Sequence, residues 1–193
     1  MSGCVILTHE GAAGVSTRAR FDTLSSMAVP LAYFITWTCR GTWLHGDGRG
    51  SVDREHNAYG TAMIPPDATM YAKSAARLKQ DSLELTAADR LLVAGAIKAT
   101  CSHRGWTIHA LAVRSNHVHS VVSADATPER VMHDLKAWST RALRQSNHDF
   151  DNRPIWTRHG STRYLFDEPA LHGAIEYVVS HETHPRAHAS GSF

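Results

Sequence analysis

The sequence predicts an α+β domain of the ferredoxin-like type, in which a split βαβ pattern forms an antiparallel sheet with helices on one face. Strand-like and helix-like segments follow one another in the order strand, helix, strand, strand, helix, strand, helix. The chain has 193 residues and 42% hydrophobic content, which suits one domain with a full core. We expect this domain to span residues 27–184 and to end with one additional helix.

The first strand is expected at 31–39, where aromatic and β-branched residues are dense. The next segment, 41–57, is rich in glycine and charge and carries Trp43 between glycines, so it predicts a long loop. Long ordered loops are often functional. A short helix is expected over 68–80.

A stronger helix is expected to begin at Thr86, because Asp89 three residues later completes a capping box. Gly105 stands where a C-terminal stop belongs. The segments 106–113 and 117–123 then read as two strands joined by a tight turn. They predict an antiparallel hairpin.

The next helix is expected to have Thr127 as its N-cap and Pro128 as its first residue. Its predicted apolar stripe consists of Val131, Leu135, Trp138 and Ala142. Residues 155–165 are typical of a short hairpin. Asp167 is expected to cap the last helix, which should end near Glu182.

The two ends of the chain carry no sustained pattern. Residues 1–26 are small and polar, and they predict either a disordered leader or a start codon placed too far upstream, with Met27 as the true start. Residues 185–193 predict a disordered tail.

The composition restricts the classes of function. The formal net charge is only +2, so any nucleic-acid partner must bind a local surface. The odd set of Cys4, Cys39 and Cys101 has no CxxC spacing, which argues against a disulfide framework or a thiolate zinc site and favours a reducing, cytoplasmic setting. No apolar run reaches the ~18 residues of a membrane span.

The segment from 117 to 123 carries a candidate metal half-site. Strand side chains alternate, so His117 and His119 point to the same face and can converge on one ion. The alternative is a half-exposed strand whose histidines make local hydrogen bonds. Since the chain has 14 histidines, one such pair can arise by chance.

The last helix carries a second candidate group. Gly173, Tyr177 and His181 are spaced four residues apart and therefore lie on one helical face. The opposite face is apolar and can be buried; it consists of Leu171, Ala174, Ile175 and Val178. The alternative is that Tyr177 lies at the edge of the core with a hydrogen-bonded hydroxyl.

Two motifs together resemble the single-tyrosine HUH transposases, a family that includes the REP-associated tyrosine transposases and small insertion-sequence transposases. Asn116 is followed by His-hydrophobic-His, and Tyr177 is followed four residues later by a polar residue. The segments YFITWTCRGTWLHGDGRG and PIWTRHGSTRYLFDEPALHGAIEYVV are similar to the family as well. The resemblance covers nearly everything after Met27.

The chain departs from this family at the position four residues after the tyrosine. The family usually carries Asn or Gln there, whereas this chain has His181, followed by Glu182. Either residue could supply a third metal ligand, and helix geometry favours His181 because it lies above the tyrosine. The change is also compatible with a decayed or repurposed site.

The resemblance implies a metal-dependent enzyme that cleaves and rejoins single-stranded or hairpin DNA. Tyr177 would be the catalytic nucleophile and would form a 5′-phosphotyrosine. His117, His119 and His181 would hold Mg²⁺ or Mn²⁺ against the scissile phosphate. The oligomeric state implied is a monomer or a homodimer.

Two other functions stay open. One is a catalytically inactive protein, kept for binding hairpin or single-stranded DNA. The other is a metal-dependent phosphodiesterase that uses water as its nucleophile.

DNA contacts are expected from local basic and aromatic residues. The stretch 130–163 has seven basic Arg or Lys residues against three Asp, a local charge of +4, and arginine forks suit phosphates while aromatic rings suit unpaired bases. The alternative for the helical part is a solvated face. The candidate DNA-binding residues are Arg40, Trp43, Arg49, Arg141, Arg144, Arg153, Arg158 and Arg163.

Overall fold

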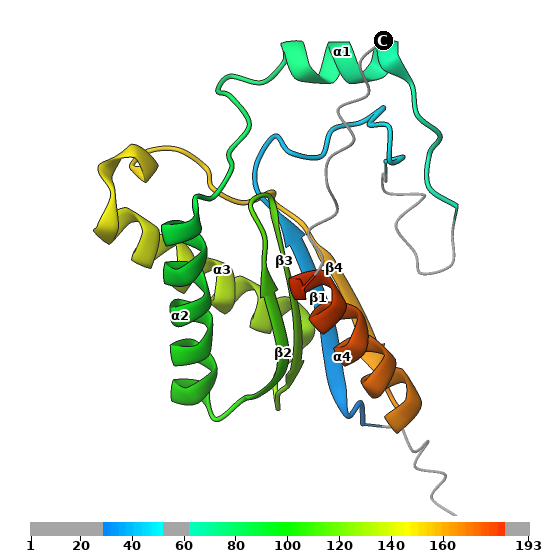
Figure 1. The fold of residues 1–193 in the computed structure, drawn as a ribbon, viewed down its shortest axis with the longest axis vertical. Coiled ribbons are helices and arrows are strands. Elements are labelled where there is room, and N and C mark those ends of the chain that lie inside the picture. The colour runs from blue at the N-terminus through cyan, green and yellow to red at the C-terminus, as the bar shows by residue number, and fades with distance from the viewer. Residues whose placement is uncertain (1–28, 52–61, 184–193) are drawn as a thin grey trace, which may run out of the picture.

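The computed structural model describes residues 29–51 and 62–183, with backbone alone for 181–183. Within these ranges a four-stranded sheet lies between helices (Figure 1). The elements in chain order are β1 (Ala32–Thr38), α1 (Ala68–Ala76), α2 (Ala87–Arg104), β2 (Thr107–Val113), β3 (His117–Ser123), α3 (Pro128–Ser146), a 3₁₀ turn η1 (His148–Phe150), β4 (Ser161–Leu165) and α4 (Glu168–Thr183).

The strand order is β2-β3-β1-β4, and every neighbouring pair is antiparallel. This is the order that a split βαβ pattern produces, with β1 and β3 in the centre. The β1–β3 register places Thr36 opposite His119 and Thr38 opposite His117. The predicted ferredoxin-like α+β fold is therefore confirmed.

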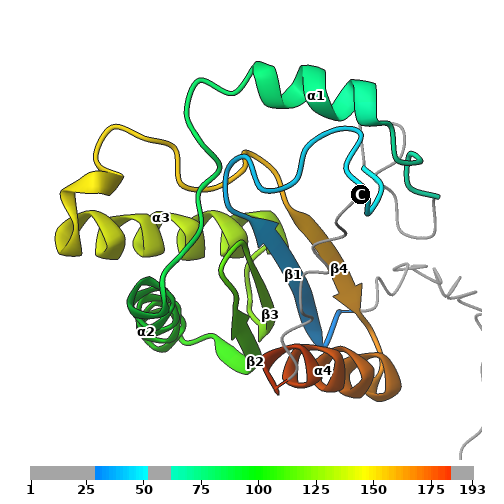
Figure 2. The same ribbon diagram turned by 45° about the horizontal axis from the view of Figure 1, so that its top comes forward.

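The two faces of the sheet bury separate cores. On one face Tyr33, Ile35 and Trp37 of β1 join a cluster with residues of α2 and α3. On the other face Ala32 joins a smaller cluster with residues of α4, and Phe34 packs against it. Figure 2 shows α2 and α3 on one side of the sheet and α4 on the other. The strand alternation thus directs each second residue of β1 and β3 toward α4.

Helix α2 begins and ends as its sequence predicts. The Thr86 side chain accepts a hydrogen bond from the Asp89 backbone, and the Asp89 carboxylate accepts one from the Thr86 backbone. Gly105 ends the helix in the left-handed conformation, φ 70°. Val93 and Ile97 are fully buried against the sheet.

Helix α3 begins at the predicted cap, but its buried stripe differs from the prediction. Val131 and Leu135 are buried as expected. The stripe then continues at four-residue spacing through Ser139 and Leu143. Trp138 is 44% exposed, so the prediction that it faces the core is wrong. The buried positions of α3 are spaced four residues apart, so position 139 faces the core and position 138 does not. A small Ser139 is buried, and the large Trp138 beside it is not.

Residues 155–165 do not form the predicted hairpin. Trp156 bridges to Cys39, and β4 pairs with β1, so the whole segment runs along one neighbour. Residues 157–160, between this bridge and β4, belong to no strand. A Cβ on Gly160 would lie 2.4 Å from the Thr36 carbonyl oxygen and 2.6 Å from Met132 Sδ, so only glycine fits against β1. The glycine that suggested a turn instead permits a close approach of two strands.

The loop after β1 is covered by α1. Asp67 caps α1 by accepting a hydrogen bond from the Met70 backbone, and the Asp67 backbone donates to the Gly46 carbonyl. Gly46 has φ 85°, and a Cβ there would lie 2.3 Å from the Asp67 carbonyl oxygen. The helix ends at Ala76, four residues before the predicted end.

The predicted leader, the Met27 start and the predicted tail lie outside the described residues, and the boundaries 27–184 stay a prediction. Within the described part of the chain, no helix has both the length and the apolar character that crossing a membrane requires.

Candidate active site

Strand β3 presents two imidazoles to the face that α4 covers. His117 and His119 alternate with Val118, which is fully buried in the opposite core. The two imidazole centroids are 4.6 Å apart. His119 is only 7% exposed, whereas His117 is half-buried at the start of the strand. The predicted convergence of the pair on one face is confirmed.

Each imidazole is oriented by an oxygen atom at its Nδ1. Thr36 Oγ1 lies 2.8 Å from Nδ1 of His119, across the β1–β3 pair. Asn116 Oδ1 lies 2.6 Å from Nδ1 of His117. Oxygen partners of this kind fix the ring orientation of histidines that ligate metals. The pair is therefore preorganised on a rigid strand.

Helix α4 brings Tyr177 to this pair. Asp167 accepts a hydrogen bond from the backbone N–H of the third helical residue, as the sequence predicts. The helix is anchored by its apolar face: Leu171, Ala174 and Val178 are buried against the sheet. Tyr177 lies at the edge of this contact and is 44% exposed.

The Tyr177 ring contacts both His119 of β3 and Phe34 of β1. Its centroid is 5.5 Å from that of His119, at 77°, and 5.7 Å from that of Phe34, at 74°. Phe34 in turn stacks on His119 at 5.7 Å. Three elements thus supply one cluster, because the strand register brings β1, β3 and α4 together at this point. Edge-to-face contacts of this type hold the rings in a fixed relation.

The donor set fits a divalent cation in part. Two imidazoles on one strand suit a divalent transition metal and leave positions for other ligands. Among the residues whose side chains the structure describes, no group of three or more His, Cys, Asp or Glu could hold a metal ion. The predicted third ligand, His181, and its alternative, Glu182, belong to α4, and their side chains lie outside that description.

Three predicted DNA-binding residues belong to the loop after β1. Arg40 is exposed. Arg49 forms an ion pair with Asp47 at 2.8 Å and donates to the Thr42 carbonyl. Trp43 donates to the Gly50 carbonyl, and the Arg49 guanidinium lies 5.7 Å from its ring. Hydrogen bonds from Arg49 hold the pKa of Asp47 below its usual value.

Two further predicted DNA-binding residues hold the 147–154 loop. Arg144 donates to the backbone carbonyls of Phe150 and Arg153, and Arg153 donates to the Asp81 carbonyl. These bonds show a structural role for both arginines. A role in DNA binding stays a prediction.

The remaining predicted residues are distributed over both faces of the sheet. Arg141 is exposed and its guanidinium lies 5.4 Å from the Trp138 ring. Arg158 is exposed and lines a shallow groove with Lys136 of α3. Burial lowers the pKa of Lys136 to about 8. Arg163 lies opposite Phe34 in the sheet, on the face that carries the histidines.

Two residues of the cluster, Thr36 and Phe34, were not predicted from the sequence. Thr36 and Phe34 share a face of β1 by simple alternation, but their contact with His119 depends on the β1–β3 register. The signal available in the sequence was the i, i+2 spacing of an aromatic and a hydroxyl residue on a strand. This spacing does not predict a contact with His119 unless the partner strand and its register are known.

Comparison with known proteins identifies one sequence family. The family described as "Transposase IS200 like" matches residues 72–167. This segment contains His117 and His119 and ends before Tyr177. No curated protein matches the chain.

Two solved structures are similar to the chain. One is described as the structure of a REP-associated tyrosine transposase bound to a REP hairpin; it is 13% identical, with 83% of this chain and 72% of that chain covered and a TM-score of 0.49. The other is a crystal structure of a candidate transposase from Deinococcus radiodurans R1. It is 12% identical, with 90% and 97% covered and a TM-score of 0.39.

Proposed function

Because residues 72–167 belong to the IS200-like transposase family, we propose that the protein is a DNA transposase that cleaves and rejoins single-stranded DNA through a covalent bond to Tyr177. The substrate class is single-stranded DNA that can fold into a hairpin. The family supports a DNA-processing enzyme, and the geometry around Tyr177 supports the finer mechanism.

The observation that carries the proposal is the contact of Tyr177 with His119, whose ring lies 4.6 Å from that of His117. A tyrosine that served only to pack α4 against the sheet would be expected to contact apolar side chains, and not an imidazole. Here the ring of a 44% exposed tyrosine lies 5.5 Å from the imidazole of His119. A phosphodiester placed over the histidine pair would therefore lie within reach of a tyrosine on a well-anchored helix. Such positioning converts the attack into an effectively unimolecular step.

The reaction is a transesterification. The Tyr177 oxygen forms a bond to phosphorus and loses its proton, and the bond from phosphorus to the 3′ oxygen breaks. The leaving oxygen takes up a proton and becomes a 3′-OH, while the 5′ phosphate stays on the tyrosine. Because one phosphodiester replaces another, no external energy source is required, and the reverse attack by a 3′-OH rejoins the strand.

The metal is proposed to be Mg²⁺ or Mn²⁺, held by His117 and His119 together with His181. When bound, a divalent cation polarises the scissile phosphate and stabilises the charge that develops on it. The chain's own contribution is orientation: Thr36 and Asn116 fix the two imidazoles at Nδ1. The third ligand is where this chain differs from the family: the family usually has Asn or Gln four residues after the tyrosine, and this chain has His181.

We propose that two cations near the site, Arg40 and the half-buried Arg163, bind the DNA backbone. Arg40 lies two residues after the end of β1 and is exposed. Arg163 lies on the histidine face of the sheet, one strand away from Phe34. Guanidinium groups at these positions suit phosphate oxygens on either side of the scissile bond. The exposed pair of Trp138 and Arg141 on α3 lies on the other side of the sheet and suits unpaired bases instead.

The experiment is a denaturing-gel assay with Mn²⁺ and hairpin oligonucleotides taken from the DNA that flanks the gene. A label at the 3′ end should travel with the protein, because the tyrosine retains the 5′ phosphate of the downstream fragment. A label at the 5′ end should be released with a free 3′-OH. Tyr177→Phe should abolish the adduct, whereas Tyr164→Phe should retain it, because Tyr164 is equally exposed but packs on Tyr33 on the other face.

Other outcomes identify the two alternatives. Binding without cleavage in both wild type and Tyr177→Phe would identify a recognition protein that has lost strand transfer. Cleavage without an adduct, retained in Tyr177→Phe, would identify a phosphodiesterase that uses water.

A further inference from the structure

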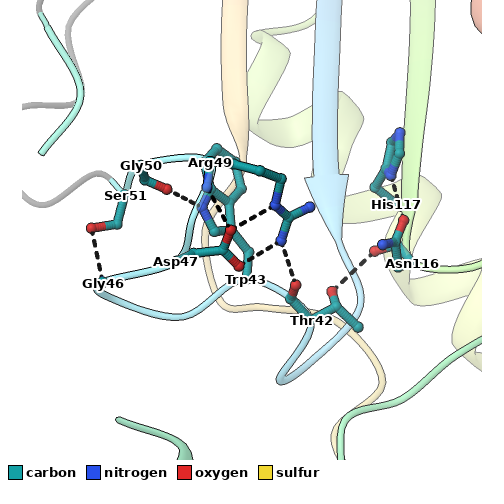
Figure 3. A network of polar contacts seen from close by, with 9 residues as sticks. All are labelled: Thr42, Trp43, Gly46, Asp47, Arg49, Gly50, Ser51, Asn116 and His117. Atoms are coloured by element: carbon teal, nitrogen blue, oxygen red, sulfur yellow. Dashed lines mark hydrogen bonds and ion pairs between the residues drawn. The ribbon is translucent and has the colours of Figure 1, made fainter. Parts of the chain in front are cut away.

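A continuous chain of polar contacts joins the loop after β1 to His117 (Figure 3). The loop is closed on itself by Arg49, which pairs with both oxygens of Asp47, and by Trp43, which donates to the Gly50 carbonyl at 2.7 Å. Arg49 also donates to the Thr42 carbonyl at 2.8 Å. These bonds give the 42–51 loop a defined conformation and tie Arg49 back to its first residue, Thr42.

Thr42 connects this loop to the turn before β3. Its hydroxyl lies 2.8 Å from the Cys39 carbonyl and 3.2 Å from the Asn116 carbonyl. The Cys39 backbone N–H donates to the same Asn116 carbonyl at 2.7 Å. The preceding residue is held as well, because the Leu85 backbone donates to the Ser115 carbonyl at 2.6 Å. The backbone of the turn is thus fixed from three sides.

Asn116 passes this constraint to the imidazole. Its side-chain oxygen can only accept a hydrogen bond, so the 2.6 Å contact requires a proton on Nδ1 of His117. In the neutral ring the lone pair then lies on Nε2. A fixed tautomer and a fixed ring plane are what a metal-ligating histidine needs from its surroundings.

We propose that Thr42 and Asn116 are positioning residues, through which the folded 42–51 loop sets the tautomer and orientation of His117. This inference rests on the proposed function where it concerns the metal. It does not rest on it where it concerns the imidazole, because the tautomer can be measured without any metal. The loop then has two proposed roles. One is the DNA contact predicted for Trp43 and Arg49, and the other is support of His117, which no sequence motif indicates.

The test uses the full chain and two readouts. The first is the ¹⁵N–¹H correlation spectrum of the histidine rings in metal-free protein, with His117 assigned by His117→Gln. The second is the affinity for Mn²⁺, measured by calorimetry. The variants are Asn116→Ala, which removes the acceptor, Asn116→Asp, which retains one, and the pair Thr42→Val and Thr42→Ser.

We expect the wild-type spectrum to show His117 with its proton on Nδ1. Asn116→Ala should lose this single tautomer and bind Mn²⁺ about 10- to 100-fold more weakly, and Asn116→Asp should restore both. Thr42→Val should weaken Mn²⁺ binding in the same direction by a smaller factor, and Thr42→Ser should not. Thr140→Val is the matched control, because its hydroxyl bonds Trp156 on the other face of the sheet.

The outcomes separate this inference from the proposed function. If wild type binds no Mn²⁺ but Asn116→Ala still loses the Nδ1–H tautomer, the positioning role stands and the metal role of the pair fails. If Asn116→Ala and Thr42→Val keep both the tautomer and the wild-type affinity, the inference is overturned, whatever the activity of the protein.

Discussion

The hydrogen bond between Thr36 and His119 gives a sharp prediction about the histidine pair. Thr36→Val removes the hydroxyl that lies 2.8 Å from Nδ1 and keeps the shape and the β-branched character of the side chain. One net hydrogen bond is worth about 0.5–1.5 kcal/mol, and about 1.4 kcal/mol corresponds to a tenfold change in affinity. Loss of an orienting partner of a metal ligand typically weakens binding about 10- to 100-fold.

The structure favours the lower end of this range. His119 is 7% exposed, and the rings of Phe34 and Tyr177 continue to hold its imidazole when the hydroxyl is lost. We therefore expect Thr36→Val to bind Mn²⁺ about tenfold more weakly than wild type. Calorimetric titration of the full chain measures this directly.

Two variants control for effects on the strand itself. Thr36→Ser restores a hydroxyl and should recover most of the affinity. Thr38→Val removes a hydroxyl from the same face of the same strand, but that hydroxyl bonds Thr157 and not an imidazole. An equal loss in Thr36→Val and Thr38→Val, or no loss in either, would refute the assignment of Thr36 to the orientation of His119.

Three predictions concern stability. Gly160→Ala should lower the free energy of unfolding by about 1–3 kcal/mol in urea titration, because its Cβ meets backbone; an unchanged midpoint would show that the strands can separate. Thr86→Ala should cost about 0.5–2 kcal/mol through loss of the α2 cap, whereas Thr86→Ser should cost little. Burial alone would raise the pKa of Asp134, but the hydrogen bond with His133 and the contacts with Arg130 and Arg104 hold that pKa below its usual value. Its stabilising effect is present above about pH 4 and is lost as the pH falls through the lowered pKa, so unfolding measured from pH 6 to 2 should show a shallower loss in Asp134→Asn.

The sequence allowed the elements that carry local signals to be predicted closely. The α2 capping box, the β2–β3 hairpin and the N-cap of α3 all depend on residues within a few positions of one another. The same is true of the shared face of His117 and His119, which follows from alternation along one strand. Local chemistry was sufficient in each case.

Features that depend on the packing of distant segments were not predictable in this way. The 155–165 segment contains a glycine and looks like a turn, but Gly160 serves a close approach to β1. Trp138 looks like core and is half-exposed. Arg49 and Arg144 are predicted DNA contacts, and that role stays a prediction; what the sequence does not indicate is that Arg49 bonds the Thr42 carbonyl within its own loop and that Arg144 bonds the Phe150 carbonyl.

The candidate site shows the same division. Tyr177 and the histidines were predicted from the spacing of their motifs, whereas the contacts that orient His119 come from Thr36 and Phe34, on a strand more than 80 residues away in sequence. No spacing rule connects these residues, because the connection is made by the β1–β3 register. The geometry of the site therefore depends on the pairing of β1 with β3 as well as on the two sequence motifs.

The most direct test of the proposed reaction is peptide mapping by mass spectrometry. Wild-type protein incubated with Mn²⁺ and a hairpin oligonucleotide is digested with nuclease and protease, and the peptide that carries the nucleotide is sequenced. We predict a single modified peptide with the nucleotide phosphate on Tyr177. A phosphate on another residue, or cleaved DNA with no modified peptide, would contradict the assignment of Tyr177 as the nucleophile.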